Sequence, residues 1–249
     1  MNAVAEPVMS LDVAAATHRG GRDTNEDAVQ TWAGAQCVLS VVADGVGGEP
    51  WGEVASSLAT TEVASFARKC VDHWRAKGKP VPTERIVRLA FDKATRRLLK
   101  EAESRACPFG LRATLMITLV IGDELTYGYL GDGAILLCRP HEDTLEELMV
   151  PMRAGEAGPL TGSIGPDLRG TPVIGRCAVR PGSIVLSTTD GLGDLLTREH
   201  WLALCRQLAT DAEPAATIEQ LLQHCASLAV DRQPVFGDNL TLSAIRVAP

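Results

Sequence analysis

Residues 36–52 of the chain read QCVLSVVADGVGGEPWG, and this stretch contains the strand, loop and helix start around which the rest is arranged. Residues 36–43 form an apolar, β-branched run, which predicts a buried strand. The run ends at Asp44-Gly45, and two more glycines follow at positions 47 and 48. Small and apolar residues then recur at helical spacing over 53–71, so we expect a helix directly after the loop.

Strand-like and helical blocks alternate along the rest of the chain. A breaker at 78–82 precedes a second amphipathic pattern, and we expect Thr83 to cap that helix. Two short separators, Gly122-Asp123 and Gly131-Asp132-Gly133, are typical of hairpin turns. Residues 139–170 predict a loop without any long element. The predicted strands span 36–43, 113–121, 125–130, 134–138, 173–179, 183–188 and 240–247, and the predicted helices span 53–71, 83–98, 198–209 and 214–230.

Strands in hairpin-like groups, with helices in pairs between them, favour an α+β fold over a parallel βαβ arrangement. No Pro-, Gly- or Ser-rich linker divides the chain, and no internal repeat is visible. We therefore expect one domain that spans residues 1–249.

Composition excludes several classes of protein. The chain of 249 residues has 24 basic and 31 acidic side chains, and a net charge of −7 does not suit a nucleic-acid partner. No apolar stretch reaches the length of a membrane helix, and residues 1–16 lack the basic region of a signal peptide. The seven cysteines have no CxxC spacing, so we expect no zinc site and a reducing, cytoplasmic location.

Acidic residues at the ends of strand-like runs are the most informative feature. Asp44, Asp190 and Asp238 each adjoin an apolar segment, and a sheet could bring them together at one end. The alternative is that Asp-Gly is ordinary turn chemistry, which is sufficient for Asp132-Gly133. Turn chemistry explains less well why acid is concentrated at Asn25-Glu26-Asp27 beside an arginine.

Converging carboxylates would need a cation, because several like charges within about 4–6 Å raise one another's pKa and cannot all stay ionised. Carboxylate, carbonyl and water oxygens are the ligands that Mg²⁺ and Mn²⁺ prefer. The five histidines lack HxxxH spacing, so no zinc constellation competes with this interpretation. The residues thus indicate a site for hard divalent cations, on condition that folding gathers them.

Five motifs in order carry a resemblance to a known family. The chain resembles the metal-dependent type 2C protein serine/threonine phosphatases, and the motifs extend over nearly its whole length. The resemblance implies an α-β-β-α sandwich of two antiparallel sheets flanked by helix pairs, with a two-metal centre at one end. The motifs are RDTNED at 22–27, ADGVGG at 43–48, GDG at 131–133, TTDGL at 188–192 and GDNLT at 237–241.

The resemblance also implies a set of metal ligands. Asp44 would bridge two Mn²⁺ or Mg²⁺ ions. Asp190 and Asp238 would complete the shell of one ion, and Glu26 with the backbone carbonyl of Gly45 would complete the other. Two such ions can hold a water, lower its pKa and direct it in line at phosphorus.

Other positions take roles from the same resemblance. Arg22 matches the phosphate-binding arginine, whose planar fork suits two phosphate oxygens. Asp27 would accept a hydrogen bond from metal-bound water, and Asp132 would share a third, weaker ion with Asp190. Val46 stands where many eukaryotic members have a histidine that can act as a general acid, and valine cannot donate a proton.

The implied activity is hydrolysis of phosphoserine and phosphothreonine on a phosphorylated protein substrate, in opposition to a serine/threonine kinase. The net charge and the lack of a long apolar stretch predict that the chain binds neither nucleic acid nor membrane, and the lack of receptor or repeat segments favours a monomer. Two alternatives remain open at this point. The chain could be a pseudophosphatase that binds a partner without turnover, or a phosphohydrolase of small molecules.

Overall fold

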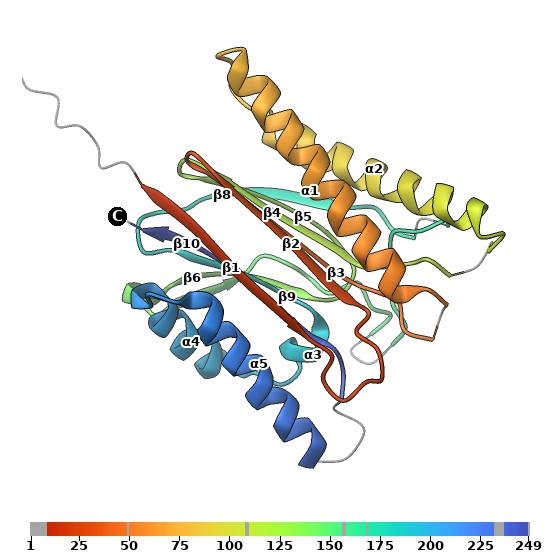
Figure 1. Ribbon diagram of the computed structural model, residues 1–249. Helices are drawn as coiled ribbons and strands as arrows, with labels where there is room; N and C mark the ends of the chain where they lie inside the picture. The colour runs from red at the N-terminus through yellow and green to blue at the C-terminus, as the bar shows by residue number, and fades with distance from the viewer. Residues whose placement is uncertain are drawn as a thin grey trace, which may run out of the picture.

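The computed structural model describes residues 9–48, 50–107, 110–155, 158–167, 169–231 and 237–248. Two five-stranded antiparallel sheets lie face to face, and helices cover the outer face of each sheet (Figure 1). The strand order is β1-β10-β9-β6-β7 in the first sheet and β2-β3-β4-β5-β8 in the second. The α+β sandwich expected from the sequence is therefore confirmed.

The element bounds complete this description. The first sheet contains β1 (Ser10–His18), β10 (Leu240–Ala248), β9 (Ile184–Thr188), β6 (Ala134–Arg139) and β7 (Thr144–Glu147). The second sheet contains β2 (Asp27–Gly34), β3 (Cys37–Asp44), β4 (Leu115–Ile121), β5 (Glu124–Leu130) and β8 (Val173–Ala178). The helices are α1 (Gly52–Ala76), α2 (Thr83–Ser104), α3 (Asp190–Gly193), α4 (Arg198–Thr210), α5 (Pro214–Asp231) and the 3₁₀ turn η1 (Pro140–Glu142).

Three apolar cores separate the four layers, and β3 contributes to two of them. Leu39 and Val41 belong to the core beneath α1 and α2, whereas Val38 and Val42 belong to the core between the sheets. A strand that is buried on both faces needs apolar residues at successive positions, which is why this run lacks alternation. The third core lies between the first sheet and α4 and α5.

The expected hairpin at residues 131–133 is wrong. Strands β4 and β5 do form a hairpin around Gly122-Asp123, but β5 and β6 belong to different sheets. Residues 131–133 therefore cross from the second sheet to the first. Gly131 has a φ of +136°, and a Cβ there would lie 2.5 Å from the Cβ of Thr114. The composition of residues 131–133 is typical of a turn. Packing decides whether the next strand joins the same sheet or the other sheet.

The expected cap at Thr83 is also wrong. Pro82 is the residue before α2, and no side chain caps the helix. The Thr83 hydroxyl instead donates to Glu124 at 3.2 Å and accepts from Thr126 at 2.7 Å. Because both partners lie on β5, this side chain connects the start of α2 to the sheet.

Three strands of the described residues have no counterpart among the sequence expectations, namely β1, β2 and the short β7. Strand β1 pairs with β10 along its whole length, and β2 pairs with β3. Alanines occupy three successive positions of β1, and alanine has low strand propensity. Tertiary pairing therefore makes these segments strands. Among its described residues, the loop expected at 139–170 contains η1 and β7 and no longer element. Helix α1 extends five residues beyond the predicted end.

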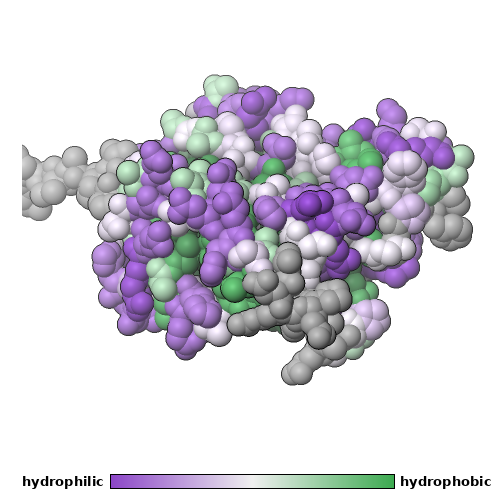
Figure 2. All heavy atoms as spheres, turned by 60° about the horizontal axis from the view of Figure 1, so that its bottom comes forward, coloured by the Kyte–Doolittle hydropathy of each residue, from purple (hydrophilic) through white to green (hydrophobic). Residues whose placement is uncertain are grey.

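Helices α4 and α5 leave a hollow of about 730 Å³ on the outer side of the first sheet, with Leu196, Leu204 and Leu221 in its lining. Figure 2 turns this side of the molecule forward and shows apolar patches among hydrophilic residues. None of the helices in the described ranges combines the length and apolarity that a bilayer crossing requires.

Candidate metal centre

Strand register brings three aspartates to one end of the first sheet. The carboxyl end of β9 pairs with the amino end of β10 on one side and of β6 on the other. Asp190 follows β9, Asp238 precedes β10 and Asp132 precedes β6. Antiparallel pairing therefore places all three at the same edge, although they come from distant parts of the sequence.

The second sheet adds carboxylates to the same end. Asp27, the first residue of β2, pairs with Asp44, the last residue of β3, and Glu26 precedes this pair. The Gly45 N–H donates to the Glu26 carbonyl at 3.0 Å. Thr114 fixes the backbone of Asp44, since its N–H donates to the Asp44 carbonyl at 2.8 Å and its hydroxyl accepts from the Asp44 N–H at 3.0 Å.

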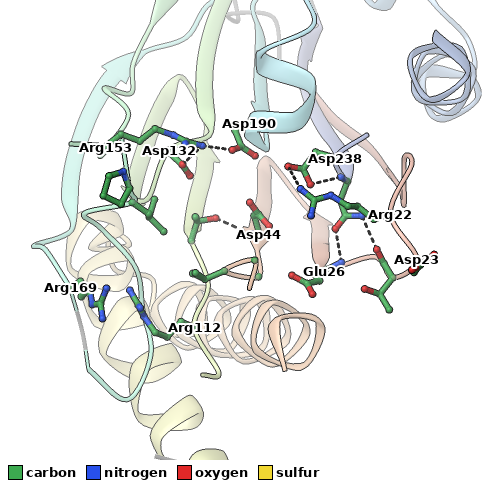
Figure 3. A pocket seen from close by; sticks show the side chains of 18 residues that line it. Arg22, Asp23, Glu26, Asp44, Arg112, Asp132, Arg153, Arg169, Asp190 and Asp238 are labelled. Carbon is green, nitrogen blue, oxygen red and sulfur yellow. Dashed lines mark hydrogen bonds and ion pairs between the residues drawn. The ribbon is translucent and has the colours of Figure 1, made fainter. Parts of the chain in front are cut away.

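The two edges meet in a pocket of about 610 Å³ (Figure 3). Among the described residues, six acidic side chains and four arginines line it, so two negative charges are in excess when all are ionised. Asp27 is not part of the lining. The sequence-predicted residues that line the pocket are Arg22, Glu26, Asp44, Gly45, Asp132, Asp190 and Asp238.

Burial and mutual repulsion raise the pKa values of these carboxyl groups. Burial raises the pKa of Asp44 well above its usual range, and the charges of Asp27 and Asp190 raise it further. Burial, followed by the charges of Asp132 and Asp238, raises the pKa of Asp190 to about 7. The pocket therefore brings together more carboxyl groups than can all stay ionised without a bound cation.

Asp27 lies beside Asp44 on the neighbouring strand and is almost wholly buried. Its Oδ2 accepts a hydrogen bond from the Thr189 hydroxyl at 2.8 Å, whereas Oδ1 is buried without a hydrogen-bond partner in the described part of the chain. Burial raises the pKa of Asp27 to about 6, while the Thr241 and Thr189 hydroxyls oppose this. A buried acceptor with an unused oxygen is suited to a water or ion in the pocket.

Two arginines pair with the carboxylates. Nη2 of Arg22 lies 3.0 Å from Oδ2 of Asp238, and both side chains are largely exposed. Nη2 of Arg153 lies 2.6 Å from Oδ2 of Asp132 and also contacts Oδ2 of Asp190. The sequence pointed to Arg22 but not to Arg153, which lies in the loop at 139–170 where no periodicity or motif marks it.

Two further arginines on the opposite wall were also missed (Figure 3). Arg112 is buried, and its Nη2 donates to the Ser163 hydroxyl at 2.6 Å. Arg169 lines the same wall and pairs with Asp167 at 3.2 Å. The only available signal was the position of Arg112 directly before a predicted strand.

The donor chemistry fits hard divalent cations. Every candidate ligand is an oxygen, and no histidine or cysteine lines the pocket among the described residues. Among the described residues, no group of three or more Asp, Glu, His or Cys side chains is arranged so that it could hold a metal ion. Instead Asp238 and Asp190 are paired with Arg22 and Arg153.

The chain is similar to known protein phosphatases in sequence and in fold. The chain is 24% identical to protein phosphatase PhpP of Streptococcus pneumoniae over an alignment of 248 residues. This alignment covers 90% of this chain and 92% of PhpP. The catalytic domain of the serine/threonine protein phosphatase PstP, solved in complex with two manganese ions, has a similar fold. Its TM-score is 0.73 at 23% identity, over 97% of this chain and all of that one.

Stp1, a serine/threonine phosphatase from Staphylococcus aureus, has a TM-score of 0.74 at 21% identity, and all of both chains is covered. At these identities the structural likeness establishes the fold. The sequence profile of the protein phosphatase 2C family matches residues 15–224, which is most of the chain. The chain therefore belongs to the protein phosphatase 2C family.

Proposed function

We propose that this phosphatase hydrolyses phosphoserine and phosphothreonine on proteins with the help of two divalent cations, Mn²⁺ or Mg²⁺. The observation that carries the proposal is the convergence of distant carboxylates in one pocket at the end of the sandwich. When bound, the two cations supply an activated water and positive charge that offsets the charge of the phosphate.

The proposed ligands follow from the elements that carry them. Asp44, held by Thr114 at the end of β3, lies centrally in the pocket and is suited to contact both ions (Figure 3). Asp190 and Asp238 would hold one ion from the first sheet. Glu26 and the Gly45 carbonyl would hold the other from the second sheet.

Three side chains take other roles in this proposal. Arg22 is exposed at the pocket rim, so it can leave Asp238 and bind two phosphate oxygens with its planar fork. Asp27 would orient a water through the oxygen that has no partner in the described residues. Val46 lines the pocket but cannot donate a proton, so the leaving oxygen must take its proton from another source.

Substitution of the central carboxylates tests the proposal. We expect Asp44→Asn and Asp190→Asn to lower Mn²⁺-dependent hydrolysis of phosphopeptides by more than about 100-fold, because each removes charge that holds a cation. Circular dichroism should remain unchanged. Asp92→Asn, an exposed position on α2, is the matched control and should retain activity.

Activity that persists in excess EDTA would contradict the metal mechanism. Failure to cleave any phosphopeptide, with Mn²⁺ bound and the fold intact, would favour the pseudophosphatase alternative. Cleavage of small phosphate esters but no phosphopeptides would favour the small-molecule phosphohydrolase. Phosphopeptides scored for serine and threonine against tyrosine distinguish the substrate class.

The proposal extends to organisation and partners. We propose one catalytic domain over residues 1–249 that acts as a monomer, supported by the apolar cores that each join a sheet to its neighbouring layer. The reaction would oppose a serine/threonine kinase. The seven cysteines lack CxxC spacing, which supports a reducing compartment such as the cytoplasm.

A further inference from the structure

One nitrogen of Arg153 bridges two aspartates in the pocket. Nη2 lies 2.6 Å from Oδ2 of Asp132 and also contacts Oδ2 of Asp190 (Figure 3). The Asp132 side chain is 6% exposed and that of Asp190 is 19% exposed, so this double ion pair is largely removed from water. Removing one partner from an ion pair this enclosed is costly, because it leaves a buried charge without compensation.

The backbone fixes Arg153 close to these partners. The N–H of its neighbour Met152 donates to the carbonyl of Gly131 at 2.8 Å, and Gly131 is the residue before Asp132. Arg153 itself forms an isolated β-bridge with Leu160. The segment that carries Arg153 is therefore hydrogen-bonded to residues 131–133, the connection between the two sheets that contains Asp132.

The chemistry of guanidinium makes this a permanent cation. Arginine stays protonated in proteins, and unlike a metal ion it cannot dissociate from the chain. The guanidinium contacts one oxygen of each of the two carboxylates that would hold a divalent ion shared by Asp132 and Asp190. A guanidinium and a metal ion cannot occupy this position together.

We propose that Arg153 is a tethered cation that takes the place of an additional divalent ion between Asp132 and Asp190. The guanidinium and the ion then exclude each other, and the native chain binds two ions where it would otherwise bind three. This inference rests on the two-metal centre proposed above, but it concerns a separate position. It also assigns a role to a residue that no motif marks.

Metal stoichiometry tests this directly. The metal-free protein is titrated with Mn²⁺, and free Mn²⁺ is followed by electron paramagnetic resonance, with native mass spectrometry as a count of bound ions. We expect two ions in the native protein and a third in Arg153→Gln, bound at least about tenfold more tightly than any third ion in the native chain. Arg153→Gln with Asp132→Asn should lose the third ion again.

Arg169→Gln is the matched control, because Arg169 lines the same pocket but pairs with Asp167. It should bind two ions like the native protein. Equal stoichiometry and affinity in the native chain and Arg153→Gln would overturn the inference, as would a tight third ion in the native chain. If the native protein binds no Mn²⁺ at all, the proposed two-metal centre fails instead. Should Arg153→Gln not fold, Arg153→Met gives the same comparison.

Discussion

Gly45 in the pocket wall and Gly52 at the start of α1 approach each other closely. A Cβ on Gly45 would lie 2.4 Å from the backbone of Gly52, and a Cβ on Gly52 would lie 2.8 Å from Oε2 of Glu26. Backbone atoms cannot move aside without shifting α1, whereas a carboxylate can rotate away. The same substitution therefore has different consequences at the two positions.

We expect Gly52→Ala to leave the fold intact but to displace the Glu26 carboxylate. Activity with Mn²⁺ should fall about 10- to 100-fold, because a misplacement of about 1 Å at a catalytic site has effects of this size. The free energy of unfolding should change by less than about 1 kcal/mol, since alanine suits a helix better than glycine. Steady-state kinetics and urea unfolding measure the two quantities.

Gly45→Ala is the contrasting variant. The clash there is with backbone, so we expect a loss of about 2 kcal/mol or more in the free energy of unfolding. A Gly45→Ala protein as stable as the native chain, or a Gly52→Ala protein with full activity, would show that this close approach does not constrain the site.

At the scale of elements, α2 shows how local pattern determines burial. Its apolar residues recur at positions three and four apart, and those facing the second sheet are fully enclosed. Leu98 is 0% exposed, whereas its neighbour Leu99 is 42% exposed. The two leucines thus have the same helix propensity and opposite environments, which makes them a matched pair.

We expect Leu98→Ala to destabilise the protein by about 2–5 kcal/mol, because it removes buried apolar atoms and leaves a cavity. Leu99→Ala should cost less than about 1 kcal/mol. Urea unfolding followed by circular dichroism measures both values. Similar losses for the two variants would mean that the α2 face is assigned wrongly.

At the scale of the whole molecule, the pocket makes stability depend on pH. The pKa of Asp27 is raised to about 6 and that of Asp190 to about 7, mainly by burial. In the pH range between the usual pKa and these values, the folded chain binds more protons than the unfolded chain. Stability from these groups is therefore complete at low pH and is lost as pH rises toward about 7.

We expect the metal-free protein to lose on the order of 3 kcal/mol of unfolding free energy between pH 5 and pH 8, from this source. Urea unfolding in EDTA measures the slope, and Asp190→Asn should flatten it. Saturating Mn²⁺ should reduce the loss, because a bound cation offsets the repulsion between carboxylates. A metal-free chain that becomes more stable over this range would contradict the assignment.

Local sequence patterns are sufficient to predict the elements whose causes are local. The apolar run of β3, the periodicity of α2 and the paired patterns of α4 and α5 each predict structure within a short window. Acidic residues at strand ends, such as Asp44 and Asp190, predicted the candidate ligands, because antiparallel strands must place their ends at common edges. The resemblance of the motifs added the sandwich and the order of the ligands.

The remaining features depend on contacts between segments that are distant in the sequence. The turn chemistry at Gly131-Asp132-Gly133 is the same whether the chain reverses within one sheet or crosses to another. Arg153 meets Asp132 and Asp190 only because packing brings its loop over their edge. Periodicity and turn propensity act over a few residues, whereas these ion pairs depend on contacts that form only when both sheets have assembled.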